Sequence, residues 1–169
     1  MSLGFITMDE RGAADQLLAA LVQDLVARGV PVAGMVAHDP APRGCEMSLA
    51  LFPGGPVVDI SQDLGVGADA CTLDPGALEQ AVAWVMGALE QVPPGTVLVL
   101  NKFGKQEAAG RGCRPLIAEG LERGLRTLVS VPPETRAEFL DFAGDLAQEL
   151  PSDPSVLRAF LTHAPAEKV

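Results

Sequence analysis

The 169-residue sequence is poor in basic residues, in cysteine and in long apolar runs. Only 12 residues are lysine or arginine, against 22 aspartates and glutamates, which gives a net charge of −10. Contacts to nucleic-acid phosphates need a basic surface, so this balance disfavours nucleic acid as a partner. No apolar run approaches the roughly 18 residues of a membrane span, and no secretory leader pattern opens the chain. We therefore expect a cytoplasmic protein without membrane insertion.

The three cysteines, Cys45, Cys71 and Cys113, are scattered and never form a CxxC pair. Their odd number and their spacing disfavour both a disulfide framework and a tetrahedral zinc site, and we predict no metal site. Cys45 and Cys71 are interpreted as small buried hydrophobes. Cys113 lies between two arginines, and its role stays open at this point.

The apolar pattern predicts one α/β domain over residues 1–150, followed by a tail, 151–169, with a short helix at 156–161. Parallel strands are expected at residues 3–7, 30–37, 96–100 and 125–131, and a hairpin at 45–52 and 56–61. Helices are expected from the end of the turn 8–12 to about residue 28, from Asp74 as N-cap onward, at 114–123 and at 135–150. This alternation predicts a three-layer fold with a mostly parallel sheet and an antiparallel edge hairpin.

The most informative segment is an apolar strand that stops at Asn101 and is followed by a loop with Lys102, Lys105, Glu107 and Arg111. In open α/β sheets, ligands bind beyond the carboxyl ends of the strands. A cluster of cations on an acidic protein suggests a small anionic ligand. An ordinary solvated loop is the alternative, since polar residues follow many strands.

The first strand, turn and helix carry the segment TMDERGAADQLL, residues 7–18. Backbone N–H groups at a helix N-terminus attract anions, so we expect Gly12 and Ala13 to complete the site and the loops at 8 and 101 to open on the same sheet edge. The segment is not a Walker A motif, because Ala13, Ala14 and Asp15 occupy the GKT positions. Asp15 brings a negative charge that repels phosphate, and Asp9 is predicted to be a simple N-cap.

Four segments together resemble a bacterial family of unknown function. They are MDERGAAD (8–15), CTLDPGALEQA (71–81), VLNKFGKQEAAGRG (99–112) and FAGDL (142–146). Members of that family tend to be encoded near molybdenum-uptake or molybdoenzyme genes. The resemblance thus implies a role in molybdenum metabolism and a protein partner in molybdenum uptake or molybdoenzyme maturation, but it brings no activity with it.

More distantly, the layout is similar to small nucleoside triphosphatases of the P-loop class, and this similarity implies a P-loop NTPase-like fold. Their Walker B strand ends in DEIGxxE, and the matching residues 101–107 read NKFGKQE. Gly104 and Glu107 keep the pattern. Asn101 replaces the carboxylate that would hold Mg²⁺ through water, and Lys102 replaces its acidic neighbour. Losing the Walker lysine and this carboxylate together removes the main electrostatic contributions to phosphoryl transfer.

Three functions from different classes remain open. The first is an accessory or regulatory protein that binds a nucleotide, phosphate or molybdate without efficient hydrolysis. The second is a divergent nucleoside triphosphatase, with Glu107 as the catalytic residue that orients water. The third is an interaction module without a small ligand, in which the cations pair with acids such as Glu107. The predicted anion site consists of Lys102, Lys105, Arg111, Gly12, Ala13 and Asn101.

Overall fold

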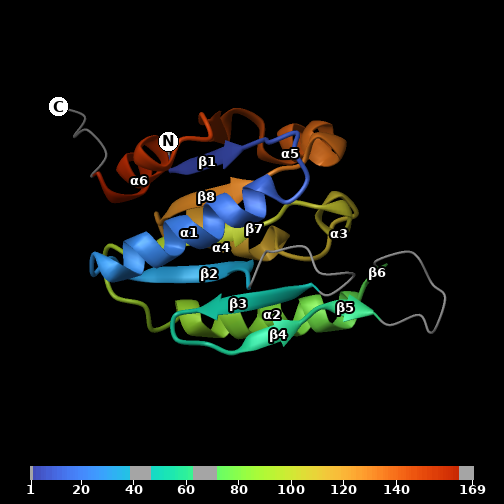
Figure 1. Ribbon diagram of the computed structural model, residues 1–169, viewed down its shortest axis with the longest axis horizontal. Coiled ribbons are helices and arrows are strands. Elements are labelled where there is room, and N and C mark those ends of the chain that lie inside the picture. Colours follow the sequence, from blue (N-terminus) through green and yellow to red (C-terminus); the bar gives the residue numbers. More distant parts are fainter. Residues whose placement is uncertain (1, 39–46, 63–71, 164–169) are drawn as a thin grey trace.

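The computed structural model describes residues 2–38, 47–62 and 72–163. Within these ranges the main sheet has seven strands in the order β4-β3-β2-β7-β8-β1-β9 (Figure 1). The strands are β1 (Leu3–Ile6), β2 (Val32–Ala37), β3 (Ser48–Phe52), β4 (Val57–Asp59), β7 (Val97–Asn101), β8 (Arg126–Ser130) and β9 (Ala147–Glu149). A separate two-stranded ribbon pairs β5 (Ser61–Gln62) with β6 (Thr72–Leu73). Cys45 and Cys71 lie outside the described residues.

The centre of the sheet is parallel. Strands β1, β8, β7 and β2 are consecutive parallel neighbours, whereas β3 and β4 run antiparallel at one edge. Every residue of β1 and β7 is buried, because helices cover both faces and leave no solvated side for polar residues. The predicted α/β fold with an antiparallel edge hairpin is confirmed.

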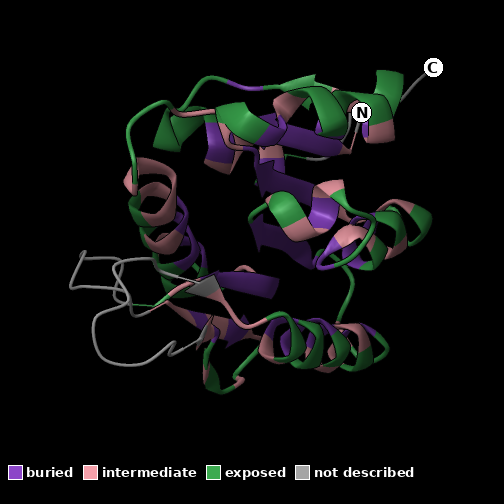
Figure 2. Cartoon of the chain, turned by 90° about the vertical axis from the view of Figure 1, so that its right-hand side faces the viewer, coloured by how far each residue is buried: buried purple, intermediate pink, exposed green. Residues whose placement is uncertain are grey.

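The helices form a layer on each side of the sheet (Figure 2). They are α1 (Ala13–Ala27), α2 (Pro75–Leu89), α3 (Lys105–Ala108), α4 (Arg114–Glu122), α5 (Arg136–Ala143) and α6 (Pro154–Thr162), with short 3₁₀ turns at Pro133–Thr135 and Gly144–Leu146. Apolar side chains of α1 and α6 share one core cluster, and those of α2, α4 and α5 share the other. Helix α2 begins as predicted, because the Asp74 carboxylate accepts a hydrogen bond from the Ala77 N–H at 3.1 Å.

The prediction of a single helix over residues 135–150 is wrong in its second half. Helix α5 ends at Ala143, and Gly144 adopts φ 55°, a conformation that glycine reaches without a side-chain penalty. The chain then forms β9, which pairs in parallel with β1 and supplies the hydrogen bonds of that edge. Leu146, which lies within the range of the predicted helix, is 60% exposed. Phe139 does lie in the core, against Phe5 and Phe103.

Two smaller differences concern helix ends. The N-cap of α1 is Gly12 at φ 80°, so the prediction that Asp9 caps this helix is wrong. The helix at the C-terminal side is longer than predicted, since Asp153 caps it and it runs from Pro154 to Thr162. Its Leu157 and Leu161 are buried in the same cluster as the apolar stripe of α1. In the part of the chain that the structure describes, no helix has both the length and the apolar character needed to cross a membrane.

Candidate anion-binding site

The carboxyl ends of the parallel strands meet the N-terminus of α1 at one edge of the sheet. This edge is on the right in Figure 1, where α1 begins and α3 follows β7. Asn101 is the last residue of β7, and its side chain contacts Asp15 in the first turn of α1. The loops that begin at Met8 and Asn101 therefore open on the same edge, as predicted.

Asn101 is held by hydrogen bonds from both sides. Its Nδ2 donates to Asp15 Oδ1 at 2.9 Å, and its Oδ1 accepts from Ser130 Oγ at 3.0 Å. Asn101 and Ser130 are buried, at 6% and 2% exposure. This chain of hydrogen bonds joins β8, β7 and α1, and it fixes the Asp15 carboxylate at the positive end of the helix dipole.

Glu107 organises the loop that follows β7. It is only 3% exposed, and its Oε1 and Oε2 accept the backbone N–H groups of Gly104 and Cys113, each at 2.8 Å. Its backbone carbonyl accepts from Arg114 Nε. Both carboxylate oxygens are thus already bound within the protein, and the side chain is closed off from solvent.

Further contacts hold the C-terminal end of the same loop in place. The Gly112 N–H donates to Glu79 Oε1 of α2 at 2.9 Å. Gly112 has φ 65°, and a Cβ at this position would lie 1.5 Å from Glu107 Oε2, so glycine is required here. The Arg114 guanidinium lies over the Phe142 ring, 4.6 Å from its centroid. The loop is therefore a preorganised structure whose backbone is fixed from α2, α4 and α5.

Burial governs the titration of the two ionisable groups inside the loop. Desolvation raises the pKa of Glu107 above its ordinary value of 4.5, against the opposing effect of the backbone N–H groups of Cys113 and Gly104. Desolvation, reinforced by the charge of Glu107, raises the pKa of Cys113 well above its usual range. Cys113 is fully buried, so its thiol is protonated and behaves as a small core side chain.

The raised pKa of Glu107 predicts a specific pH dependence of stability. Because the folded state holds this proton more tightly than the unfolded state, the stability gained from binding the proton is fully present below pH 4.5 and is lost as the pH rises through the folded pKa. We expect the free energy of unfolding of the wild type, minus that of Glu107→Gln, to fall as the pH rises from 4 upward. Urea titrations at several pH values measure this difference in the free energy of unfolding. A difference that is flat or increases with pH contradicts a raised pKa of Glu107.

The three predicted cationic ligands lie on the outside of this loop. Lys102, Lys105 and Arg111 are exposed, and none of them forms an ion pair with another residue that the structure describes. Arg114, in contrast, is used to hold the loop. The cluster therefore presents positive charge to solvent from a fixed backbone.

The N-terminal end of α1 offers fewer free N–H groups to an anion than predicted. The Ala13 N–H donates to the Glu10 carbonyl at 3.2 Å, so this group is not free to bind an anion. Gly12 lies at the N-cap without a side chain, which leaves the approach to α1 open. The structure thus brings Asn101 and the start of α1 together, with Asp15 between them, and it keeps Glu107 inside the loop.

Two residues of this region were not predicted from the sequence. Ser130 ends β8, and the rule that singled out Asn101, a polar residue closing an apolar strand, would have found it as well. Glu79 gives no such signal, because it lies on α2, 33 residues before its partner Gly112 in the loop. In the described parts of the chain, no three or more His, Cys, Asp or Glu side chains are grouped so that they could hold a metal ion.

Comparison with solved structures identifies the fold. The chain is similar to a human cancer-related nucleoside triphosphatase, with a TM-score of 0.63, 18% identity, and coverage of 89% of this chain and 88% of the other. It is also similar to THEP1 from the hyperthermophile Aquifex aeolicus, with a TM-score of 0.64, 12% identity, and coverage of 92% and 91%. At these identities the likeness shows a P-loop NTPase-like fold, in agreement with the prediction.

Comparison of sequences identifies the relatives. The chain is 35% identical over 149 residues to the molybdenum import ATP-binding protein ModC 2 of Bradyrhizobium diazoefficiens. The match covers 86% of this chain and spans only 16% of that relative. Residues 3–160 match the family described as "Protein of unknown function (DUF2478)". Because this match extends over nearly the whole sequence, the chain is a member of the DUF2478 family.

Proposed function

We propose that this protein binds a small phosphate-bearing or oxyanion ligand at the edge between β7 and α1, without efficient hydrolysis, in an accessory or regulatory role. The observation that carries the proposal is the loop after β7, which holds Lys102, Lys105 and Arg111 exposed and without an ion pair among the described residues. On a chain of net charge −10, such a local excess of positive charge focuses anions at that edge.

The preorganised backbone favours a ligand-binding loop over an ordinary solvated loop. Glu107 and Glu79 fix the segment through three backbone N–H groups, so binding a ligand costs little loss of backbone freedom. The third function considered from the sequence required the cations to pair with acids such as Glu107. Glu107 instead accepts hydrogen bonds from backbone N–H groups inside the loop, and it forms no ion pair with the cations of the cluster among the described residues.

The surroundings of Glu107 also argue against efficient hydrolysis. A residue that orients an attacking water must reach it within hydrogen-bond distance, whereas both oxygens of Glu107 are bound and the side chain is 3% exposed. Asn101, already bound to Asp15 and Ser130, supplies no negative charge for a metal ion. We therefore expect this edge to lack the metal-dependent part of charge neutralisation in phosphoryl transfer.

The comparisons suggest which anion the protein binds, and this choice of ligand is part of the proposal. The nucleoside triphosphatases of similar fold suggest a nucleotide, and the name of the molybdenum import ATP-binding relative suggests ATP or a role in molybdenum metabolism. Phosphate and molybdate are both tetrahedral oxyanions, and charge-assisted hydrogen bonds from lysine and arginine suit either of them.

Ligand-induced stabilisation tests the proposal. A ligand that binds only the native state raises the melting temperature in proportion to RT ln(1 + [L]/Kd). Phosphate, molybdate, ATP and GTP should each be titrated by differential scanning fluorimetry at matched ionic strength, with chloride as the control for screening. We expect at least one of them to shift the melting temperature beyond chloride. If none does, the cluster is an ordinary solvated loop and the proposal fails.

Turnover is expected to be absent or very weak. With Mg²⁺ and either ATP or GTP, phosphate release should remain far below the roughly 1 to 10³ per second of typical enzymes, because Asn101 and Ala14 replace the residues on which charge neutralisation depends. Robust release that co-purifies with the wild type and disappears in a Glu107→Gln variant that is still folded at the assay temperature would establish the divergent triphosphatase instead.

A further inference from the structure

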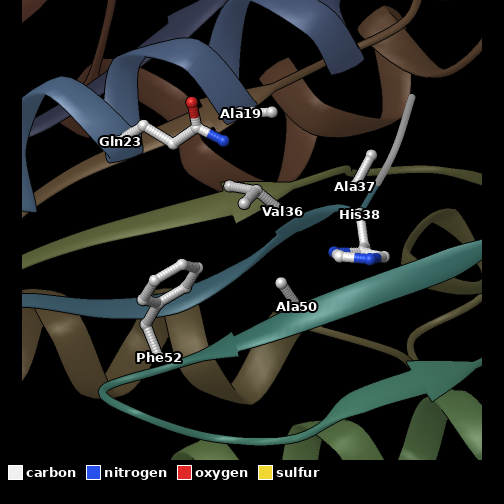
Figure 3. Close-up of a pocket in the computed structure, with 7 residues that line it drawn as sticks. All are labelled: Ala19, Gln23, Val36, Ala37, His38, Ala50 and Phe52. Carbon is white, nitrogen blue, oxygen red and sulfur yellow. The ribbon is translucent and has the colours of Figure 1, made fainter. Parts of the chain in front are cut away.

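A cavity of about 520 Å³ lies beside α1, over β2 and β3 (Figure 3). Ala19 of α1 and Ala50 of β3 line it with small side chains, and the Phe52 ring lies at one end. His38, directly after β2, lies at the other end. The volume of the cavity falls in the range of small-molecule sites, about 300 to 1,000 Å³, which combine an apolar wall with a few polar groups.

The polar groups of this cavity have no partner that the structure describes. Gln23 of α1 also lines the cavity and is drawn above Val36 (Figure 3). No side-chain hydrogen bond of Gln23 or His38 to another described residue is present, and both residues are exposed. A carboxamide offers two donors and one acceptor oxygen, which suits the edge of a planar ring carrying both donors and acceptors.

The cavity lies next to the proposed anion site. In the pairing of β2 with β7, Met35 lies opposite Leu100, so the next residue, Val36, is level with Asn101. On α1, Ala19 lies one turn beyond Asp15 and Gln23 two turns beyond it, on the same face of the helix. Eight residues of helix rise ~12 Å, so Ala19 and Gln23 line the cavity within this distance of Asp15 along α1.

We propose that this cavity holds the base of a nucleotide whose phosphates lie at the edge formed by Lys102, Lys105 and the start of α1. The inference rests on the proposed function and narrows its ligand to a nucleotide rather than a bare oxyanion. Phe52 provides an aromatic face on which a base can stack, and Gln23 provides hydrogen bonds to the edge of the base. The alanines leave the space that a ring of this size needs.

Affinity for three probes tests this assignment. ATP, GTP and inorganic tripolyphosphate should be titrated calorimetrically against the wild type, Ala50→Leu and Gln23→Ala at matched ionic strength. Ala50→Leu fills the cavity with added methyl groups, while Gln23→Ala removes the exposed amide with little effect on packing. Gln80→Ala, an exposed glutamine on α2 across the sheet, is the matched control.

We expect ATP or GTP to bind the wild type about tenfold or more tightly than tripolyphosphate. Each cavity variant should weaken nucleotide binding by about tenfold, leave tripolyphosphate binding unchanged and keep the wild-type melting temperature, and Gln80→Ala should bind like the wild type. Equal affinity for nucleotides and tripolyphosphate, or nucleotide binding unaffected in a folded Gln23→Ala variant, overturns the inference and leaves the proposed function intact. Failure of all three probes to bind also overturns the inference, and the proposed function falls with it only if phosphate and molybdate leave the melting temperature unchanged as well.

Discussion

Replacing Glu107 with alanine is expected to lower the free energy of unfolding by about 3 kcal/mol. The variant leaves the N–H groups of Gly104 and Cys113 without their acceptor in a buried place, and each unsatisfied buried donor costs about 1–3 kcal/mol. It also opens a cavity next to Gly112, which approaches the Glu107 carboxylate closely. Urea denaturation at pH 7, followed by circular dichroism, measures the loss.

Two companion variants separate the hydrogen bonds from the volume of the side chain. Glu107→Gln keeps the shape and one acceptor oxygen, so it should lose less than the alanine variant. Glu79→Ala removes one acceptor, for the Gly112 N–H, from an exposed side chain, so it should cost about 1 kcal/mol or less. If Glu107→Ala unfolds with the same midpoint as Glu79→Ala, Glu107 does not organise the loop.

Removing the two lysines is expected to weaken anion binding by about 10- to 100-fold. In Lys102→Ala/Lys105→Ala, the fixed loop loses two of its three exposed cations while the buried contacts of Glu107 remain. The ligand is whichever of phosphate, molybdate, ATP or GTP stabilises the wild type most, and its dissociation constant is measured by calorimetry. Because both lysines are exposed, the variant should keep the wild-type melting temperature without ligand.

Two controls with charge changes elsewhere make this prediction specific. Arg28→Ala/Arg123→Ala removes the same charge at the C-terminal ends of α1 and α4 and should change affinity by less than about threefold, since distant charges are screened. Asp15→Asn keeps an acceptor for Asn101 and removes the negative charge at the start of α1, so it should strengthen binding by a few-fold. Equal losses of affinity in both double variants would mean that the lysines act only through the net charge of the protein.

The sequence located the strands well because their burial on both faces leaves a continuous apolar run. The run of β7 ended at Asn101 in the sequence, as it does in the structure. The same approach failed for residues 147–149, because Ala-Gln-Glu has no strand pattern and pairs only because β1 presents an open edge. A helix was predicted there from the apolar pattern, and Gly144 ends that helix with a conformation that the pattern did not distinguish from a tolerated helical glycine.

At the candidate site, the sequence identified the charged residues of the loop but not the contacts that hold the loop in place. Lys102, Lys105 and Arg111 stand out because they are rare on this acidic chain. Under the alternative of a divergent triphosphatase, Glu107 is the predicted catalytic residue on the pattern of a related motif. In the structure its carboxylate lies inside the loop between two backbone N–H groups. Nothing in the local sequence shows which way a carboxylate in a loop points.

The sequence by itself determined the alternation of strands and helices, the parallel centre of the sheet and the position of the cationic loop at its edge. These features depend on apolar periodicity and on the order of elements along the chain, both of which are local properties. Only the tertiary structure decided that Asn101 joins Asp15 to Ser130 and that a cavity lies beside α1 with Phe52 at one end. Such contacts join residues far apart in the sequence, and their geometry is fixed only when the elements pack against one another.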